Sequence, residues 1–84
     1  MKRKDIYTLI DAERARQAAK WGGQHYWGHG DCSSDGVSDA VKVGVLTEEC
    51  GEVARAFLEH DPEALTAELI QVAAVAVAWL EGRP

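Results

Sequence analysis

Residues 66–80, TAELIQVAAVAVAWL, decide the expected fold. The part from 72 to 80 is wholly apolar, so a helix through it is apolar on every side. Such a helix needs neighbours all round, and a chain of 84 residues offers few other elements. We therefore expect a second copy of the chain among those neighbours, in a homodimer or homotetramer.

Start and stop signals bound this helix on both sides. Asp61 is suited to the N-cap and Pro62 to the first helical position, because proline has no backbone N–H to leave unpaired. Gly82 follows the last apolar turn, where glycine commonly ends a helix. The sequence therefore predicts a helix over 62–81.

Two further helices and a loop are predicted upstream. Residues 3–20 are rich in helix formers and end in a lysine that is soon followed by two glycines. A second helix over 38–60 begins at Ser38 or Asp39, either of which can cap it. Between these helices, residues 22–37 collect most of the glycine and read as a loop of a length typical of functional segments.

A heptad-like apolar stripe on the second helix completes the expected architecture. Its members alternate at spacings of three and four, which predicts burial against a partner helix: Val43, Leu46, Cys50, Val53 and Phe57. No strand pattern or repeat is visible. We predict a single all-α domain over 1–84 with three helices, whose last two form a hairpin that assembles with another chain into a four-helix bundle.

Charge and the lengths of the apolar runs argue against two classes of protein, those that bind nucleic acids and those that bind membranes. Nine Lys and Arg against fourteen Asp and Glu give a net charge of −5, which argues against nucleic-acid binding. There is no N-terminal apolar leader, and the run 72–80 is shorter than the roughly 20 residues that span a membrane. We expect a cytoplasmic protein that binds no membrane, with Cys32 and Cys50 reduced.

Acidic side chains recur on the two helices of the hairpin. Glu49 and Glu52 are three residues apart and share one face, and Glu68 shares a face with Gln71 in the same way. Carboxylates beside an apolar stripe point toward a helix–helix crevice, where they repel unless a cation lies between them. Oxygen ligands of this kind suit Mg²⁺ or Mn²⁺. The alternatives are a solvated glutamate face and, for Gln71, a hydrogen-bonded core amide.

These residues carry a family resemblance. EECGE at 48–52, followed after fifteen residues by ELIQ at 68–71, resembles the E-E-x-x-E…E-x-x-D signature of the MazG-like all-α nucleoside triphosphate pyrophosphohydrolases. ERARQAAKWGGQHYWGHG at 13–30 is similar to the Trp-Gly-containing first helix and loop of phage-type and mobile-element members. AELIQVAAVAVAWLEG at 67–82 is similar to their matching helix, so the resemblance covers most of the chain.

The resemblance implies a Mg²⁺-dependent hydrolase that releases a nucleoside monophosphate and pyrophosphate from a nucleoside triphosphate, in nucleotide-pool house-cleaning. It assigns metal ligation to Glu49, Glu52 and Glu68, and gives Glu48 the role of a neighbouring ligand or water-orienting base. Gln71 stands where the family has aspartate. An amide oxygen can ligate Mg²⁺ but brings no charge and cannot act as a base.

Substrate contacts are expected from the first helix and the loop. Basic side chains there are predicted to contact phosphates: Arg14, Arg16 and Lys20. Aromatic and polar side chains are predicted to hold sugar and base: Gln17, Trp21, His25, Tyr26, Trp27 and His29. The plainer interpretations are an exposed basic helix face and a tryptophan packed against the bundle.

Three other interpretations stay open at this point. A zinc site at His25, His29 and Cys32 is conceivable, but it lacks a clear fourth ligand. The chain could instead be a nucleotide-binding or interaction module that has lost catalysis, as the glutamine at 71 indicates. It could also be a structural helical oligomer with a solvated acidic face.

Overall fold

Three helices make up most of the chain in the computed structural model, which describes all residues from Met1 to Pro84. The helices are α1 (Arg3–Trp21), α2 (Asp39–Leu58) and α3 (Pro62–Glu81). The loop between α1 and α2 contains two short strands, β1 (Gln24–His25) and β2 (Gly28–His29). The predicted all-α class is therefore confirmed.

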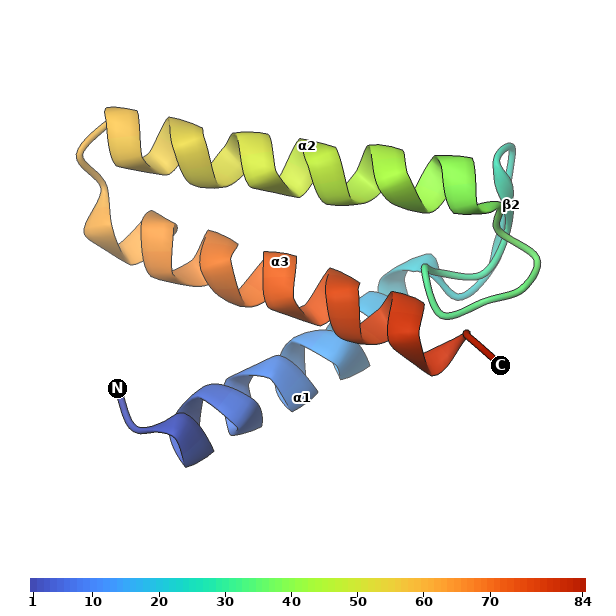
Figure 1. Ribbon diagram of the computed structural model, residues 1–84, viewed down its shortest axis with the longest axis horizontal. Coiled ribbons are helices and arrows are strands. Elements are labelled where there is room, and N and C mark those ends of the chain that lie inside the picture. The colour runs from blue at the N-terminus through green and yellow to red at the C-terminus, as the bar shows by residue number, and fades with distance from the viewer.

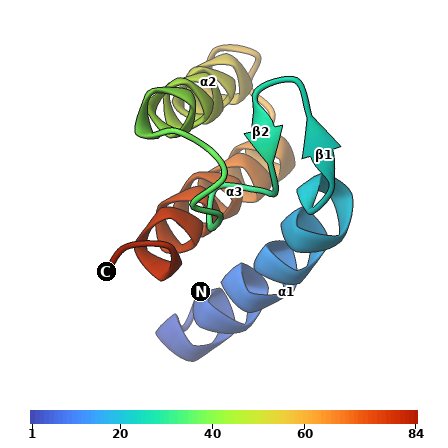
Figure 2. The same cartoon turned by 90° about the vertical axis from the view of Figure 1, so that its right-hand side faces the viewer.

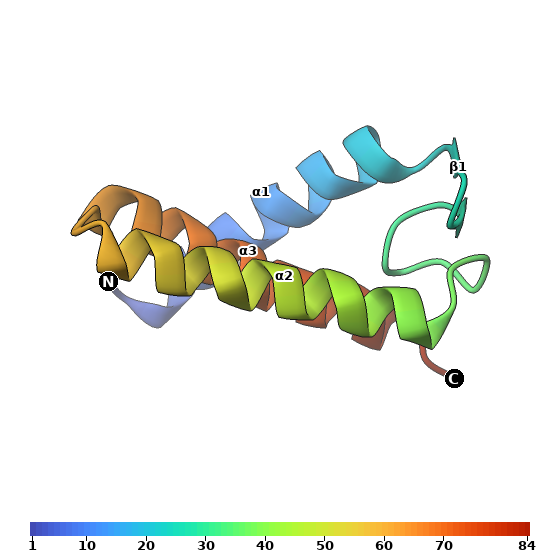
Figure 3. The same cartoon turned by 90° about the horizontal axis from the view of Figure 1, so that it is seen from above.

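Helix α3 is the central element of the fold. It packs against α2 along an antiparallel hairpin and against α1 on another side (Figure 1). Viewed end-on, α3 lies between α1 and α2, and the β1–β2 loop closes one end of the space between those two helices (Figure 2). Seen from above, α2 follows α3 while α1 crosses at an angle and leads into the loop (Figure 3).

The start of each hairpin helix is held by a side-chain cap. The Ala64 N–H donates to Asp61 Oδ1 at 3.0 Å, and Pro62 occupies the first turn, as predicted. The Val41 N–H donates to Ser38 Oγ at 3.3 Å, so Ser38 is the cap of α2. These bonds satisfy backbone donors that have no partner within the helix.

The predicted helix ends differ from the observed ones by at most two residues. Helix α3 spans the predicted range, and α1 continues one residue further, to Trp21. Helix α2 ends at Leu58 instead of 60 because His60 adopts a left-handed conformation, with φ 56°. That turn lets the Asp61 N–H reach the Ala56 carbonyl at 3.0 Å and closes the helix.

The loop 22–37 is more ordered than the sequence analysis expected. Strands β1 and β2 pair antiparallel, and Gly28 forms a further bridge to Val37, which is buried. Gly28 has φ 139°, and a Cβ there would lie 2.2 Å from the Gly36 carbonyl oxygen. Gly30 has φ 100° and faces Ser34 in the same way. The tight folding of the loop therefore depends on these glycines.

The core within one chain is small. Its buried apolar residues are Val37, Ala56, Ala74, Val75 and Ala78. The stripe predicted to be buried on α2 is only partly covered within the chain: Leu46 and Val53 are half-buried, whereas Val43 is 51% exposed and Phe57 is 67% exposed. The most deeply buried residues of α2 are Lys42 and Ala56, which do not belong to the stripe.

Helix α3 is long and apolar enough to cross a membrane by length and composition alone. The uninterrupted apolar run 72–80 is too short to span a membrane, whereas the full helix Pro62–Glu81 is long enough. One such helix is weak evidence, because the core helix of a soluble bundle has the same composition.

Candidate functional site

Two of the predicted metal-ligating carboxylates come together between α2 and α3. Glu49 and Glu68 each have one buried oxygen, Oε2, with no hydrogen-bond partner in the chain. Burial raises the pKa of Glu49, and so does the charge of Glu68, followed by those of Glu48, Glu52 and Glu13. Unpaired carboxylate oxygens are costly to bury unless a proton or a cation neutralises their charge.

The predicted metal ligands do not all lie around one point. No group of three His, Cys, Asp or Glu side chains in the chain is close enough to hold one metal ion. Glu52 lies within 3.8 Å of Arg55 and, together with Glu68, lines a small hollow between α2 and α3. Glu49 and Gln71 instead line the main pocket. The predicted ligands are therefore divided between two spaces, with Glu52 and Glu68 at the hollow and Glu49 and Gln71 at the pocket.

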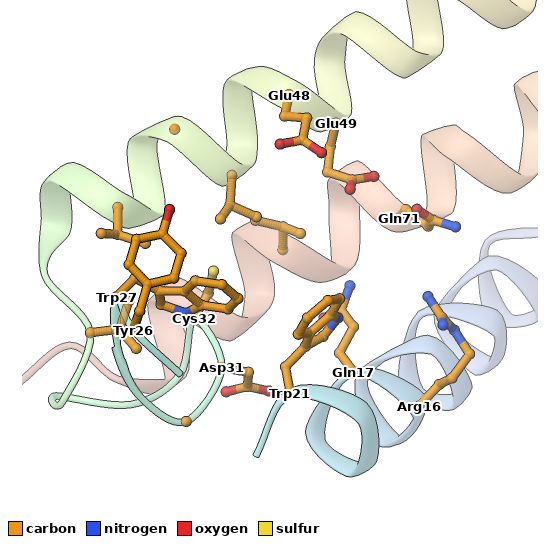
Figure 4. Close-up of a pocket in the computed structure, with 16 residues that line it drawn as sticks. Arg16, Gln17, Trp21, Tyr26, Trp27, Asp31, Cys32, Glu48, Glu49 and Gln71 are labelled. Carbon is orange, nitrogen blue, oxygen red and sulfur yellow. The ribbon is translucent and has the colours of Figure 1, made fainter. Parts of the chain in front are cut away.

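The main pocket has a volume of about 560 Å³ and lies between α1, α2 and the loop, with α3 behind it (Figure 4). Glu48, Glu49 and Gln71 lie toward one end, and Arg16 and Gln17 approach from α1. Aromatic rings of Trp21, Tyr26 and Trp27 line the other part. A space of this size with an aromatic part and a polar end suits a nucleotide-sized ligand.

Arg14 does not lie in the pocket wall, although the sequence analysis predicted a phosphate contact. Its guanidinium is buried, with Nη2 2.8 Å from Glu81 Oε2 and Nη1 2.9 Å from Asp31 Oδ2. It also donates to Gln17 Oε1 at 3.0 Å. The hydrogen bond to Glu81, and then the partnership with Asp31, raise the pKa of Arg14. Arg14 therefore joins α1 to the loop and to the end of α3.

Arg16 occupies the place on α1 that faces the pocket. Its Nε donates to Glu13 Oε1 at 2.8 Å, and half of its side chain is exposed. The hydrogen bond to Glu13 raises the pKa of Arg16, with a small contribution from the charge of Glu49. Arg16 is thus a half-exposed cation of the pocket lining that is paired with Glu13.

The other predicted substrate contacts divide into two groups. Gln17 and Trp21 line the pocket. Lys20 lies over the Trp21 ring, with Nζ 4.8 Å from its centroid, and is outside the lining. His25 stacks on Trp27 at 4.4 Å and lies near the Trp21 carbonyl, so it supports the aromatic wall from behind.

His29 is exposed and does not line the pocket, although it was predicted to contact substrate. Its carbonyl accepts a hydrogen bond from Ser34 Oγ at 2.6 Å, so it helps to fold the loop. No zinc set forms from His25, His29 and Cys32. Burial raises the pKa of Cys32, which opposes the thiolate that a zinc site needs.

Several lining residues were missed by the sequence analysis. They are Gly30, Asp31, Cys32, Val37, Val41, Gly44, Val45 and Val75. Val41, Val45 and Glu48 are spaced by four and three, so a helical projection that started from Glu48 would have found this face of α2. The loop residues carry no such signal, because long-range contacts place them.

Comparison with models of protein families, with curated proteins and with solved structures gives no match. The resemblance to the MazG-like group therefore stays a prediction.

Proposed function

We propose that the protein is a Mg²⁺-dependent nucleoside triphosphate pyrophosphohydrolase, which yields a nucleoside monophosphate and pyrophosphate. The observation that carries the proposal is the pair of buried, unpartnered carboxylate oxygens of Glu49 and Glu68 beside the aromatic pocket. The resemblance to the MazG-like signature, which contains the same two carboxylates, supports the same reaction. Clearance of unwanted nucleotides in the cytoplasm would be the corresponding role.

The donor set fits a hard divalent cation. Glu49 and Glu68 supply carboxylate oxygens that nothing in the chain satisfies, and Glu52 is near enough to raise the pKa of Glu49. Mg²⁺ usually binds through one or two carboxylates together with waters and substrate phosphates, so the lack of a complete protein ligand set is compatible with it. A bound Mg²⁺ neutralises phosphate charge and lowers the pKa of a coordinated water.

The remaining side chains have separate roles in this proposal. Glu48 is exposed at the pocket and can accept a proton from the attacking water. Arg16 meets phosphate charge at the mouth of the pocket. Trp21 and Trp27, whose ring centroids are 5.9 Å apart, offer faces for a nucleobase. Gln17 offers an amide to sugar or base.

One observation favours a second candidate function. Gln71 lines the pocket where the resembled signature has a charged ligand, and an amide there weakens the hold on a second cation. A module that binds nucleotides without hydrolysing them would keep the same pocket. The two candidates differ in turnover, so one assay separates them.

The test is release of pyrophosphate from a panel of ribonucleoside and deoxynucleoside triphosphates, with Mg²⁺ or Mn²⁺ present. We expect metal-dependent release that Glu49→Gln and Glu68→Gln each reduce by roughly 100-fold or more, because each removes a carboxylate from the proposed cation site. Glu63→Gln is the matched control, since Glu63 is an exposed residue of the first turn of α3. Its activity should equal that of the unchanged chain.

The possible results of this assay distinguish the hydrolase from the binding module and test the ligand assignment separately. No pyrophosphate from any triphosphate would reject the hydrolase, and nucleotide-dependent thermal stabilisation in that case would identify the binding module. Full activity in both Glu49→Gln and Glu68→Gln would reject the ligand assignment while leaving the reaction in place.

A further inference from the structure

The Gln17 carboxamide lies in the pocket wall with its amide nitrogen unpaired. Gln17 is only 8% exposed, and its side chain projects from α1 beside Trp21 into the pocket (Figure 4). Its Oε1 accepts a hydrogen bond from Arg14 Nη1 at 3.0 Å. Its Nε2 has no partner in the chain, yet the only fully buried side-chain atoms that lack one are Glu49 Oε2 and Glu68 Oε2. The Gln17 NH₂ group is therefore within reach of a molecule in the pocket.

Arg14 fixes which end of that carboxamide faces the pocket. A guanidinium carries N–H donors and no acceptor, so only the oxygen of the amide can face it. The guanidinium is itself held in place, because Nε and Nη2 donate to the two Glu81 oxygens at 3.2 and 2.8 Å and Nη1 donates to Asp31 Oδ2 at 2.9 Å. A reversed amide would set N–H groups of Gln17 against those of Arg14. Gln17 is thus held as a donor toward the pocket.

The side chains beside that carboxamide favour a ligand that brings acceptors. Asp31 lines the pocket, but its Oδ2 accepts from Arg14 and its Oδ1 accepts from the Ser33 N–H at 2.9 Å. The indole N–H groups of Trp21 and Trp27, which line the same part, can only donate. A planar ligand stacked on these rings meets the amide with its edge. A donor on that edge would leave two N–H groups opposed and unpaired, which costs affinity.

On the function proposed above, in which this pocket holds a nucleotide, we propose that Arg14 is a positioning residue and Gln17 a specificity residue. Arg14 turns the Gln17 NH₂ group toward the edge of the base, and the pocket selects bases that present a carbonyl oxygen there. Uracil and thymine have O4 and guanine has O6 at that edge, where cytosine and adenine have an amino group. The preferred substrates are therefore nucleotides of the keto bases.

Binding of UTP and CTP tests the selection, because the two bases have the same size and differ in the donors and acceptors of this one edge. Their α,β-imido analogues are titrated by calorimetry in the presence of Mg²⁺, so that binding is measured without hydrolysis. We expect the unchanged chain to bind the UTP analogue roughly 10-fold or more tightly than the CTP analogue. Equal affinities, tighter binding of the CTP analogue, or no binding of either would overturn the proposal.

Gln17→Glu is the sharpest variant, because a glutamate keeps one oxygen on Arg14 and turns the other, an acceptor, toward the base. The preference should reverse in favour of the CTP analogue. Gln17→Leu has a similar size and no donor, so the preference should fall below about twofold. This second variant covers the case in which Gln17→Glu fails to fold. A full preference in Gln17→Leu would overturn the proposal.

Gln24→Leu is the matched control for these variants. Gln24 is exposed in the loop and lies outside the pocket lining. The Gln24→Leu chain should keep the preference of the unchanged chain. Loss of the preference in this control would contradict the assignment of base selection to Gln17.

Arg14→Met tests the positioning role, because methionine leaves the Gln17 amide free to present either end. The ratio of the two affinities should fall toward one, whereas Arg14→Lys, which again offers only donors to Oε1, should restore part of it. A folded Arg14→Met chain with the full preference would overturn the positioning role.

The hydrolase and the base selection can fail separately. Pyrophosphate release with equal use of UTP and CTP would reject the selection and leave the hydrolase in place. A keto preference in binding without turnover would reject the hydrolase and leave the selection in place.

Discussion

Arg14 is the residue on which the relative placement of α1, the loop and α3 depends. Its ion pair with Asp31 is largely buried, with 10% of the Arg14 and 8% of the Asp31 side chain exposed. Burial alone would raise the pKa of Asp31, but hydrogen bonds from Ser33 and the Arg14 guanidinium outweigh it and lower the pKa. Asp31 also lines the pocket, so the network that stabilises the fold also fixes part of the site wall.

Arg14→Ala should lower the free energy of unfolding by about 3–5 kcal/mol, because Asp31 would be left buried without its counter-charge. Urea unfolding followed by circular dichroism measures this change. Arg16→Ala is the control two residues away, where the partly exposed pair with Glu13 contributes only about 0–1 kcal/mol. Equal losses in the two variants would contradict the structural role given to Arg14.

At the scale of elements, the β1–β2 hairpin converts a glycine-rich segment into a wall of the pocket. Two glycines with positive φ, Gly28 and Gly30, fold the loop back so that Val37 is buried and Trp27 reaches the lining. The helices supply regular faces, but this loop places the aromatic rings opposite α2. The shape of the pocket therefore depends on backbone conformations that few other residues adopt.

Gly28→Ala should destabilise the fold by about 1–3 kcal/mol, since its φ of 139° and the Gly36 carbonyl leave no room for a Cβ. Gly23→Ala is the matched control in the same loop, because nothing lies within 4 Å of a Cβ built there. Thermal unfolding and tryptophan fluorescence report on stability and on the aromatic wall. Similar behaviour of the two variants would argue against a strained turn.

At the scale of the whole molecule, the buried carboxylate of Glu49 lowers the stability of the fold at neutral pH. The pKa of Glu49 is raised in the folded chain, so the folded state holds that proton more tightly than the unfolded state does. Below about pH 4, both states carry the proton and the penalty is absent. As pH rises through the raised value, the folded state is progressively destabilised.

Glu49→Gln should therefore raise the free energy of unfolding at pH 7 in metal-free buffer, and the gain should disappear toward pH 4. Chemical unfolding at both pH values with a chelator present measures this difference. Glu63→Gln is the control because Glu63 is exposed and its charge is not among those that raise the pKa of Glu49. A gain that is independent of pH, or one equal to that of the control, would contradict the assigned charge penalty.

The sequence by itself determined where the helices lie. Asp61 and Pro62 start α3, Ser38 starts α2, and the two capping hydrogen bonds connect residues only three positions apart. The sequence also placed Glu49 and Glu68 on the helices that form the hairpin. Caps and periodicity are local properties, so they can be read from neighbouring residues without knowledge of the fold.

Only the tertiary structure decided which faces of those helices meet and which of their side chains line the pocket. Arg14 and Arg16 look equivalent in the sequence, yet Arg14 is bonded to Glu81, 67 positions away, whereas Arg16 remains at the pocket. The split of the acidic residues between two spaces also emerged only in three dimensions. The physical reason is that burial and ion pairing depend on which faces of distant helices meet, and that choice belongs to the packing of the whole chain.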